Sequence, residues 1–270
     1  HTRLRTVTGV QTCALPIFGG KLKSFDATKV EKMPGVKKVV AIDNNAVVVV
    51  ADTYWNARNA VAAVPVEWDT GKLGDVQQAD ITAMLKEGLT ATEAYVGNKV
   101  GDAKAAIDSA AKKVEATYSY PYQHHATMEP MNCTALWTPE KCEIWGPTQN
   151  GEAALAAAAE AAELPVAKCD VHKLLLGGGF GRRGHRDEEF VVESVLLSKA
   201  SGRPVKVIWT REDDVRHGFY RPAVYNRLAA ALDPQGLPVA WTHRIAAAPI
   251  GAKFGALENG LDADLVDGAA

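Results

Sequence analysis

The sequence predicts an α+β fold of mixed strand order. Segments with a β-branched or alternating apolar pattern, such as Ala46–Ala51 and Val114–Tyr122, predict strands. They are interspersed with helix-prone segments, of which Gly151–Leu164 is the richest in alanine. At 270 residues the chain is long enough for one large domain or two modest ones with a substantial core.

The first compact unit is expected over Phe25–Thr70. Asp26 is a candidate N-cap for a helix that ends at Met33-Pro34-Gly35, where proline and glycine both interrupt helices. Asp52 is a candidate cap for a second helix. The remaining expected elements are strands at Val36–Ile42 and Ala46–Ala51, a helix at Tyr54–Ala63 and an edge strand at Val64–Trp68.

A polar stretch, Gly71–Gly101, is typical of a connector and holds one expected helix at Asp80–Glu87. A short helix at Asp102–Ala111 and a strand at Val114–Tyr122 with one buried face follow. The second domain is expected to contain strands at Thr134–Trp137, Cys142–Trp145, Val166–Leu176 and Val205–Trp209, helices at Gly151–Leu164 and Asp187–Ala200, and a hairpin of Tyr225–Leu232 with Pro238–Ala247.

Both ends of the chain are unusual. His1–Ile17 includes Cys13, shows no helical or strand period, and resembles the translation of a sequencing-library adapter. We therefore expect a non-native segment there, without a place in the fold. Asp267–Ala270 closes no element, so we expect a gene fragment. The sequence does not distinguish a periplasmic from a cytoplasmic location, because the N-terminal region that would carry a signal peptide is not among these residues.

Composition excludes several classes of function. The formal charge of −2 gives no reason to expect nucleic acid as a partner. No apolar run approaches the roughly 20 residues of a membrane span. The four cysteines form no CxxC pair, which argues against a disulfide framework, a zinc site or an iron–sulfur cluster bound by this chain. Cys133 and Cys169 lie in apolar strands and are expected to be buried, inert thiols.

The glycine-rich segment Gly177–Gly181 is the most informative part of the sequence. Four glycines in five positions let the backbone approach a ligand closely, and Arg182 and Arg183 supply positive charge where the segment ends. The dinucleotide pattern GxGxxG fails because Arg182 occupies the third glycine position, and the P-loop pattern is absent. Two interpretations stay open: a glycine-rich turn, or a loop whose N–H groups face an anionic or oxo-bearing group.

Three further motifs each have a structural and a functional interpretation. In Gly146–Asn150, Thr148 or Asn150 can cap the following helix, which leaves the Gln149 amide for a ligand. His124 and His125 point to opposite faces of a strand, which favours satisfied histidines over metal ligands. Glu129 is expected to be partly buried. Arg211–Asp214 is either a solvated charge run or holds a cation near a cofactor phosphate.

Taken in order, four motifs resemble the molybdenum-cofactor subunit of the xanthine dehydrogenase/aldehyde oxidase family. They are His125–Pro130, Gly146–Gln149, Gly177–Gly181 and Thr210–Asp213. Arg182-Arg183 and Phe219–Pro222 are most similar to the isoquinoline 1-oxidoreductase β-subunit branch. The first unit resembles the small α/β hammerhead domain of the family through Met33–Val36, Ala51–Trp55 and Val66–Asp69.

The resemblance implies a division into a hammerhead-like domain at 18–70, a connector at 71–113 and part of a mixed α/β molybdopterin-binding domain at 114–270. It implies that the pterin alone holds the molybdenum, without a protein ligand. Gln149 is expected to hydrogen-bond an oxygen on the metal or pterin side. The expected cofactor-binding residues are Gln149, Gly178, Gly179, Phe180, Gly181, Arg182 and Arg183.

The resemblance also implies a molybdenum hydroxylase that oxidises an N-heteroaromatic or aldehyde substrate with oxygen from water. The cofactor is expected in its cytosine dinucleotide form, with a 2Fe–2S cluster on a small partner subunit and a cytochrome c as a further acceptor. A substrate-binding carboxylate of xanthine-oxidising members is replaced by Gly184 and His185, which argues against a purine. The general-base glutamate is expected beyond this chain, so these residues alone should neither retain molybdenum nor turn over substrate. The alternative is a non-catalytic module that binds a nucleotide or anion, or docks a partner.

Overall fold

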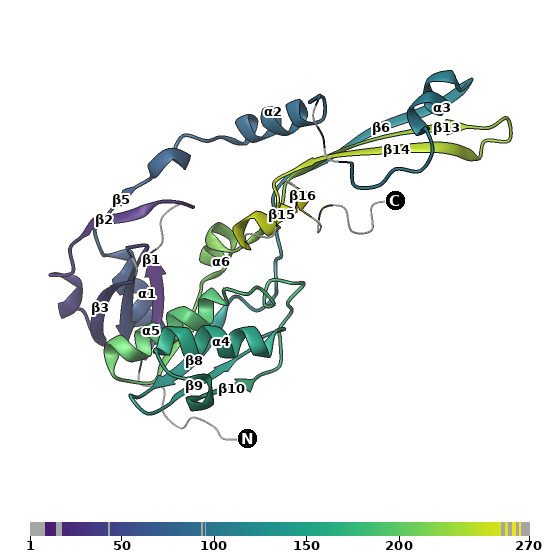
Figure 1. Ribbon diagram of the computed structural model, residues 1–270. Helices are drawn as coiled ribbons and strands as arrows, with labels where there is room; N and C mark the ends of the chain where they lie inside the picture. Colours follow the sequence, from purple (N-terminus) through teal and green to yellow (C-terminus); the bar gives the residue numbers. More distant parts are fainter. Residues whose placement is uncertain are drawn as a thin grey trace. The chain divides into compact units, whose positions relative to one another are not determined.

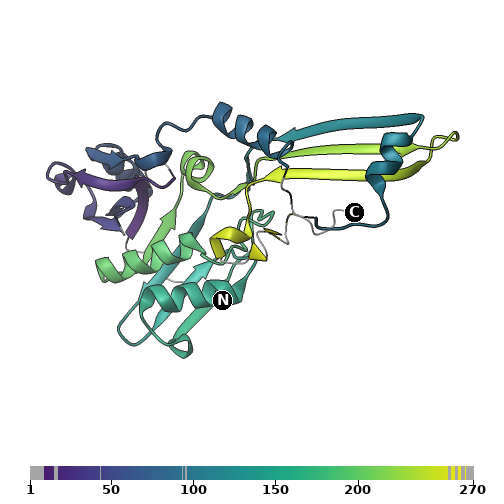
Figure 2. The same cartoon turned by 45° about the horizontal axis from the view of Figure 1, so that its top comes forward.

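The computed structural model of the protein describes residues 9–14, 18–42, 44–92, 94, 96–254, 257–258, 261–262 and 265. The chain forms two compact units, each made of two separate stretches of sequence (Figures 1 and 2). Unit 1 comprises His1–Asp75 and His125–Phe219, and unit 2 comprises Val76–His124 and Tyr220–Ala270. The division of the sequence into domains at 18–70, 71–113 and 114–270 stays a prediction. The two compact units are a different division, because each of them combines an earlier and a later stretch of the chain.

Unit 1 is built on a seven-stranded mixed sheet. Its strands, in spatial order, are β10 (Cys169–Lys173), β9 (Cys142–Gly146), β8 (Asn132–Trp137), β11 (Val205–Ile208), β1 (Gly9–Ala14), β4 (Ala46–Ala51) and β3 (Val36–Ile42). A separate antiparallel pair consists of β2 (Lys21–Phe25) and β5 (Val66–Asp69). The helices of this unit are η1 (Val30–Lys32), α1 (Tyr54–Ala62), η2 (Gly71–Leu73), α4 (Gly151–Ala162), η3 (Val166–Lys168), α5 (Glu189–Ser201) and α6 (Arg211–His217).

The part of the sheet that positions the candidate site is the β9–α4–β10 crossover. β9 and β10 are parallel, and Gly146 pairs with Lys173 at their carboxyl ends. α4 can lie close to the sheet because its inward positions, among them Ala154, Ala158 and Ala162, are small and buried. The loops after β9 and β10 therefore emerge at the same edge of the sheet, which is where ligands bind in open α/β sheets.

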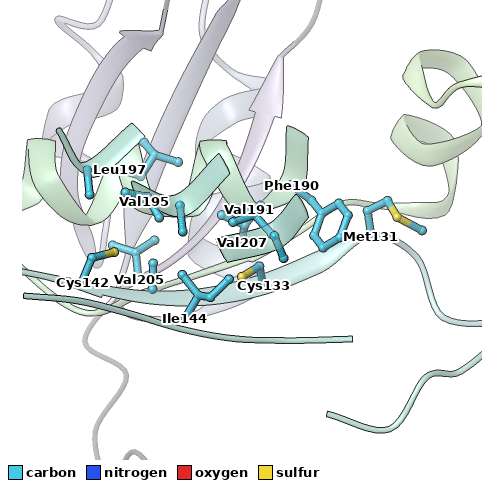
Figure 3. Packing of buried hydrophobic residues seen from close by; sticks show 14 of the residues in the cluster. Met131, Cys133, Cys142, Ile144, Phe190, Val191, Val195, Leu197, Val205 and Val207 are labelled. Atoms are coloured by element: carbon cyan, nitrogen blue, oxygen red, sulfur yellow. The ribbon is translucent and has the colours of Figure 1, made fainter. Parts of the chain in front are cut away.

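The main core lies between this sheet and α5. Val191, Val195 and Leu197 of α5 pack on Cys133, Ile144 and their neighbours on the strands (Figure 3). Cys133, Cys142 and Cys169 are free and buried, which confirms the prediction made for Cys133 and Cys169. Burial raises the pKa of the Cys133 and Cys142 thiols to about 12. These thiols therefore stay protonated and unreactive at neutral pH.

The expectation that His1–Ile17 has no place in the fold is wrong for Gly9–Ala14. This segment forms β1, which pairs in parallel with β11 and antiparallel with β4. β4 and β11 each present a row of backbone N–H and C=O groups, and an extended segment between them satisfies both rows. The periodicity of side chains could not reveal this strand, because backbone hydrogen bonds to β11 and β4 hold it in the sheet. That His1–Ile17 is a non-native segment stays a prediction.

Two other expectations are corrected. The helix expected after Asp26 is a single 3-10 turn, η1, because Pro34 follows too soon for a stable α-helix. The strand expected over Val166–Leu176 is limited to Cys169–Lys173, because the partner strand β9 ends at Gly146. The residues that follow β10 are exposed, Leu175 to 95%. The strands at Val36–Ile42 and Ala46–Ala51 are confirmed with the predicted bounds.

Unit 2 contains a three-stranded antiparallel sheet in the order β14 (Pro238–Ala247), β13 (Val224–Leu232) and β6 (Lys112–Tyr120). The predicted hairpin is confirmed as β13–β14. The predicted buried face of β6 is wrong, since Val114, Tyr118 and Tyr120 are all about half exposed. The other elements are α2 (Gln78–Gly88), α3 (Ala103–Ser109), β7 (Gln123–His124), β12 (Tyr220–Arg221), η4 (Gly251–Phe254), β15 (Leu257–Glu258) and β16 (Leu261–Asp262).

We predict that Val48→Ala destabilises unit 1, because Val48 is fully buried in the core cluster and its truncation leaves a cavity. The expected loss is about 2 kcal/mol of unfolding free energy in a urea titration. Val239→Ala is the matched control, since Val239 is 64% exposed and its truncation should change little. Equal effects of the two substitutions would contradict the assignment of the core.

Candidate functional site

Three loops of unit 1 carry the motifs that the sequence singled out, and hydrogen bonds join all three. The loop after β10 contains Gly177–Gly184, the turn after β9 contains Pro147–Gln149, and Thr127–Pro130 precedes β8. Glu129 N donates to Gly177 O at 3.0 Å, and Gln149 N donates to Arg183 O at 2.8 Å. The structure therefore brings together motifs that are distant in the chain, since Glu129 and Arg183 are 54 residues apart.

The glycines are required where neighbours approach closely. A Cβ on Gly179 would lie 2.4 Å from Gln149 Oε1, and one on Gly177 would lie 2.5 Å from Glu129 Cβ. Gly178 and Gly181 have φ of +99° and +94°, and Phe180 between them has φ of +54° despite its side chain. Such a conformation costs energy for a non-glycine residue and persists only where the surroundings enforce it. The Phe180 ring is 64% exposed.

Gln149 fixes the glycine loop through its side-chain oxygen. Oε1 accepts hydrogen bonds from Gly181 N at 3.1 Å and Arg183 N at 3.2 Å. Two donors at one amide atom identify that atom as the oxygen. The exposed Nε2 makes no hydrogen bond to any residue that the structure describes, so it can donate to a ligand. Asn150, not Gln149, caps α4, by accepting from Ala153 N.

Arg183 is fully buried and binds the backbone of all three loops. Its guanidinium donates to Gly178 O at 3.1 Å, Pro147 O at 3.3 Å and Glu129 O at 2.7 Å. It also donates to Pro130 O at 3.2 Å and forms an ion pair with the Glu129 carboxylate at 3.3 Å. The partly exposed Glu129 carboxylate in turn accepts from Gly177 N at 2.8 Å.

Arg182 is also buried and faces the other side of the loop. It forms ion pairs with Glu189 and, at 3.9 Å, with Asp214, and its guanidinium lies over the rings of Trp209 and Phe219. The two arginines place positive charge at the end of the glycine segment, but the structure buries both side chains, which the sequence analysis did not foresee. Sequence position alone could not reveal this, because a long side chain can turn inward. Direct contact of Arg182 and Arg183 with a cofactor stays a prediction.

The charge run Arg211–Asp214 is only partly solvated, because Glu212 is exposed whereas its neighbours bind other protein groups. Thr210 and Asp213 form a capping box at the start of α6, and Asp214 is fully buried. Arg211 donates to Thr127 O at 2.5 Å and Met128 O at 2.9 Å, and forms an ion pair with Asp214 at 3.2 Å. This run anchors the loop that precedes β8, which the sequence analysis did not foresee.

Sequence analysis also missed two carboxyl groups, Glu188 and Glu193, whose pKa is raised by burial. Glu188 is fully buried with φ of +41°, and its Oε1 accepts from the Thr148 hydroxyl at 2.9 Å. Desolvation raises its pKa to about 7. Glu193 accepts from Trp209 Nε1 at 2.8 Å, and desolvation raises its pKa to about 8. Glu188 lies at the start of a predicted helix, where acidic residues are common and usually exposed to solvent. Nothing in the local sequence indicated that this one is buried.

The histidines are engaged with protein groups. His125 Nδ1 lies 3.1 Å from Phe219 O, and the His185 ring stacks on Phe219 with centroids 4.0 Å apart. The described part of the chain contains no group of three or more His, Cys, Asp or Glu residues able to hold a metal ion. Among those same residues, no helix has the length and apolar character needed to cross a membrane.

Comparison with known proteins matches residues 87–253 to the model of a molybdopterin cofactor-binding domain. A membrane-bound aldehyde dehydrogenase, described as pyrroloquinoline-quinone-dependent, from Gluconacetobacter polyoxogenes is 31% identical over 91% of this chain and 33% of its own length. The isoquinoline 1-oxidoreductase subunit beta of Brevundimonas diminuta is 28% identical over 86% of this chain and 31% of its length. The chain thus spans about a third of these relatives.

The fold is also shared with a solved structure. Quinoline 2-oxidoreductase from Pseudomonas putida 86 superposes with a TM-score of 0.66 and 21% identity, covering 89% of this chain and 36% of that one.

We predict that Arg183→Lys loosens the three loops, because a lysine ammonium cannot reach all the carbonyl oxygens that the guanidinium binds. The unfolding free energy should fall by about 2–4 kcal/mol, since buried acceptors lose their donors. Arg58→Lys is the matched control on the exposed face of α1. Chemical denaturation gives the difference, and a neutral Arg183→Lys would contradict the anchoring role.

We predict that Glu193→Gln removes part of the pH dependence of stability. The folded-state pKa of Glu193 is raised from 4.5 to about 8, so the folded chain binds more protons over that range. Its stabilising contribution is complete below about pH 4.5 and is lost as the pH rises through about 8.

Glu193→Gln keeps an acceptor for Trp209 and should therefore match the parent chain at pH 5 but exceed it in stability at pH 8.5. Urea titrations at both pH values, with the exposed Glu160→Gln as control, measure this difference. A gain that is the same at both pH values would contradict the assignment.

Proposed function

Because the chain belongs to the molybdopterin cofactor-binding domain family, we propose that its glycine loop and Gln149 hold the molybdenum end of that cofactor. One observation carries this proposal. The backbone N–H groups of Gly178, Gly179 and Phe180, together with Gln149 Nε2, have no hydrogen-bond partner among the described residues. Four donors suit an oxygen-rich group and fit a molybdenum centre that needs no protein ligand.

The residues behind the loop support this assignment. Arg183, Gln149 Oε1 and Glu129 bind the loop from within the protein, so the free donors are held in place before a ligand arrives. Preorganised donors act more strongly than flexible ones because no reorganisation is needed on binding. α4 begins at Gly151 beside this loop, and its N-terminus adds partial positive charge for an anionic group.

The cofactor would supply hydroxylation of a carbon centre with oxygen taken from water. We propose an aldehyde or N-heteroaromatic substrate, since the names of the relatives include an aldehyde dehydrogenase and an isoquinoline oxidoreductase. We further propose a cytosine dinucleotide cofactor, a 2Fe–2S partner subunit, a cytochrome c acceptor and a general-base glutamate outside these 270 residues. The quinone cofactor in the name of one relative is less well supported here, because the family match covers residues 87–253.

The second candidate is a module that binds an anion without catalysis. The same free donors favour it, because phosphate oxygens accept hydrogen bonds as readily as oxo groups do. The two functions differ in which anion the loop binds more tightly and in whether substitution of Gln149 weakens that binding.

We predict that molybdate shifts the amide signals of Gly178, Gly179 and Phe180 in NMR spectra of the chain, with weak, millimolar affinity. Gln149→Leu should weaken binding at least tenfold, because Gln149 both orients the loop and supplies one donor. Gln235→Leu, in an exposed turn, is the control. A preference for pyrophosphate over molybdate, unaffected by Gln149→Leu, would favour the anion-binding module and contradict the proposal.

A further inference from the structure

The Thr148 hydroxyl lies between two acceptors, although it has a single hydrogen to donate. Its oxygen is 2.9 Å from Glu188 Oε1 and 3.2 Å from the backbone oxygen of Arg183. A hydroxyl donates one hydrogen bond and accepts two, so it cannot donate to both oxygens at once. The Thr148 oxygen also accepts from Asn150 N at 2.9 Å. The choice between the two acceptors therefore depends on the state of the Glu188 carboxyl group.

The Glu188 side chain acts on the turn after β9 and not on its own helix. Glu188 is the N-cap residue of α5, but its carboxyl group accepts no hydrogen bond from that helix. The side chain is fully buried and the backbone is held at φ of +41°, a strained conformation that persists only where the surroundings enforce it. Oε1 accepts from Thr148, whereas Oε2 has no hydrogen-bond partner among the residues that the structure describes.

Charged and titratable groups act on the Glu188 carboxyl group from three elements. Glu189 follows it in α5, and Cys133 interacts with it from β8. Arg182 and Arg183 interact with it from the glycine loop. Desolvation is the largest effect and raises the pKa of Glu188 to about 7, although both arginines favour the charged form. The Cys133 thiol stays neutral in this range, so Glu188 changes charge close to neutral pH.

Protonation of Glu188 reverses one hydrogen bond. A charged carboxylate can only accept, so the Thr148 hydroxyl then donates to Oε1 and leaves the oxygen of Arg183 to Gln149 N. A protonated Oε1 donates to the Thr148 oxygen, and the hydroxyl hydrogen turns to Arg183 O. The turn after β9 then holds the glycine loop by one more hydrogen bond.

We propose that Glu188 is a positioning residue whose proton directs the Thr148 hydroxyl to the glycine loop and thereby fixes Gln149 for ligand binding. Gln149 directly follows Thr148, and its Oε1 accepts from Gly181 N and Arg183 N. A more firmly held turn presents the donors of the loop in one arrangement, which favours an oxygen-rich anion. The proposal rests on the proposed function for the ligand alone, because the reversal of the hydrogen bond can be measured without a ligand.

The first measurement uses the 270-residue chain without ligand. In NMR spectra recorded from about pH 5.5 to about pH 8.5, the amide signals of Gly181 and Arg183 should shift with one midpoint close to the pKa of Glu188, about 7. Glu188→Gln should abolish this transition, because the amide has a similar shape but does not titrate. Glu152→Gln removes an exposed charge from the first turn of α4 and should leave the transition unchanged.

Two variants of Thr148 separate the reversal of the hydrogen bond from a plain effect of charge. Thr148→Ser keeps the hydroxyl and should keep the transition. Thr148→Val has a similar shape but no hydroxyl, so the amide signals of Gly181 and Arg183 should lose most of their pH dependence although Glu188 still titrates. Circular dichroism spectra equal to that of the parent chain establish that each variant is folded.

The second measurement adds molybdate as the probe at about pH 6 and about pH 8. The parent chain should bind it about fivefold more tightly at the lower pH, which is the effect of one hydrogen bond. Glu188→Gln should bind it equally tightly at both pH values, because its amide donates to the Thr148 oxygen in either case. If molybdate does not bind while the ligand-free transition is present, the proposed function fails and the positioning role of Glu188 stands.

Three results would overturn the proposal. They are a transition that Glu188→Gln leaves in place, a transition that Thr148→Val leaves at full size, and an affinity of the parent chain for molybdate that does not change with pH.

Discussion

The candidate site depends on one buried guanidinium. Arg183 binds carbonyl oxygens from the glycine loop, from the turn after β9 and from the segment before β8, which approach each other from separate stretches of the chain. Without a shared donor, these carbonyl groups would be buried without partners, at a cost of about 1–3 kcal/mol each. The planar fork of arginine satisfies several acceptors in fixed directions, which a lysine cannot do. The conformation of the glycine loop therefore follows from the position of one side chain.

The burial of two adjacent arginines requires compensating charge and explains the acids around them. Glu129 accompanies Arg183, and Glu189 and Asp214 accompany Arg182, while Glu188 lies beneath the loops at a strained φ of +41°. Buried ion pairs contribute little net stability, because desolvation offsets their attraction. Their effect is to fix geometry. This network leaves the loop backbone rigid enough to present unpaired donors, which a flexible glycine-rich segment would turn toward water or toward each other.

Sequence reasoning found the components of the site but not their orientation. The ordered motifs, the cap at Asn150 and the strand at Ala46–Ala51 follow from local patterns, and the structure confirms the latter two. The inward turn of the Arg182 and Arg183 side chains does not follow from local patterns. A long arginine side chain can take several rotamers, and these place its guanidinium in very different directions. Strand β1 was missed for a different reason. It is held by backbone pairing to strands distant in sequence, which no periodicity records.

Among the described residues, the glycine loop lacks hydrogen-bond partners of one kind, and that kind indicates what binds there. At the glycine loop the deficit is hydrogen-bond acceptors, because the donors of Gly178, Gly179 and Phe180 lack partners. A compact, oxygen-bearing ligand satisfies that deficit. Sites where local patterns disagree with their surroundings are expected where further components bind, and this deficit is of that type.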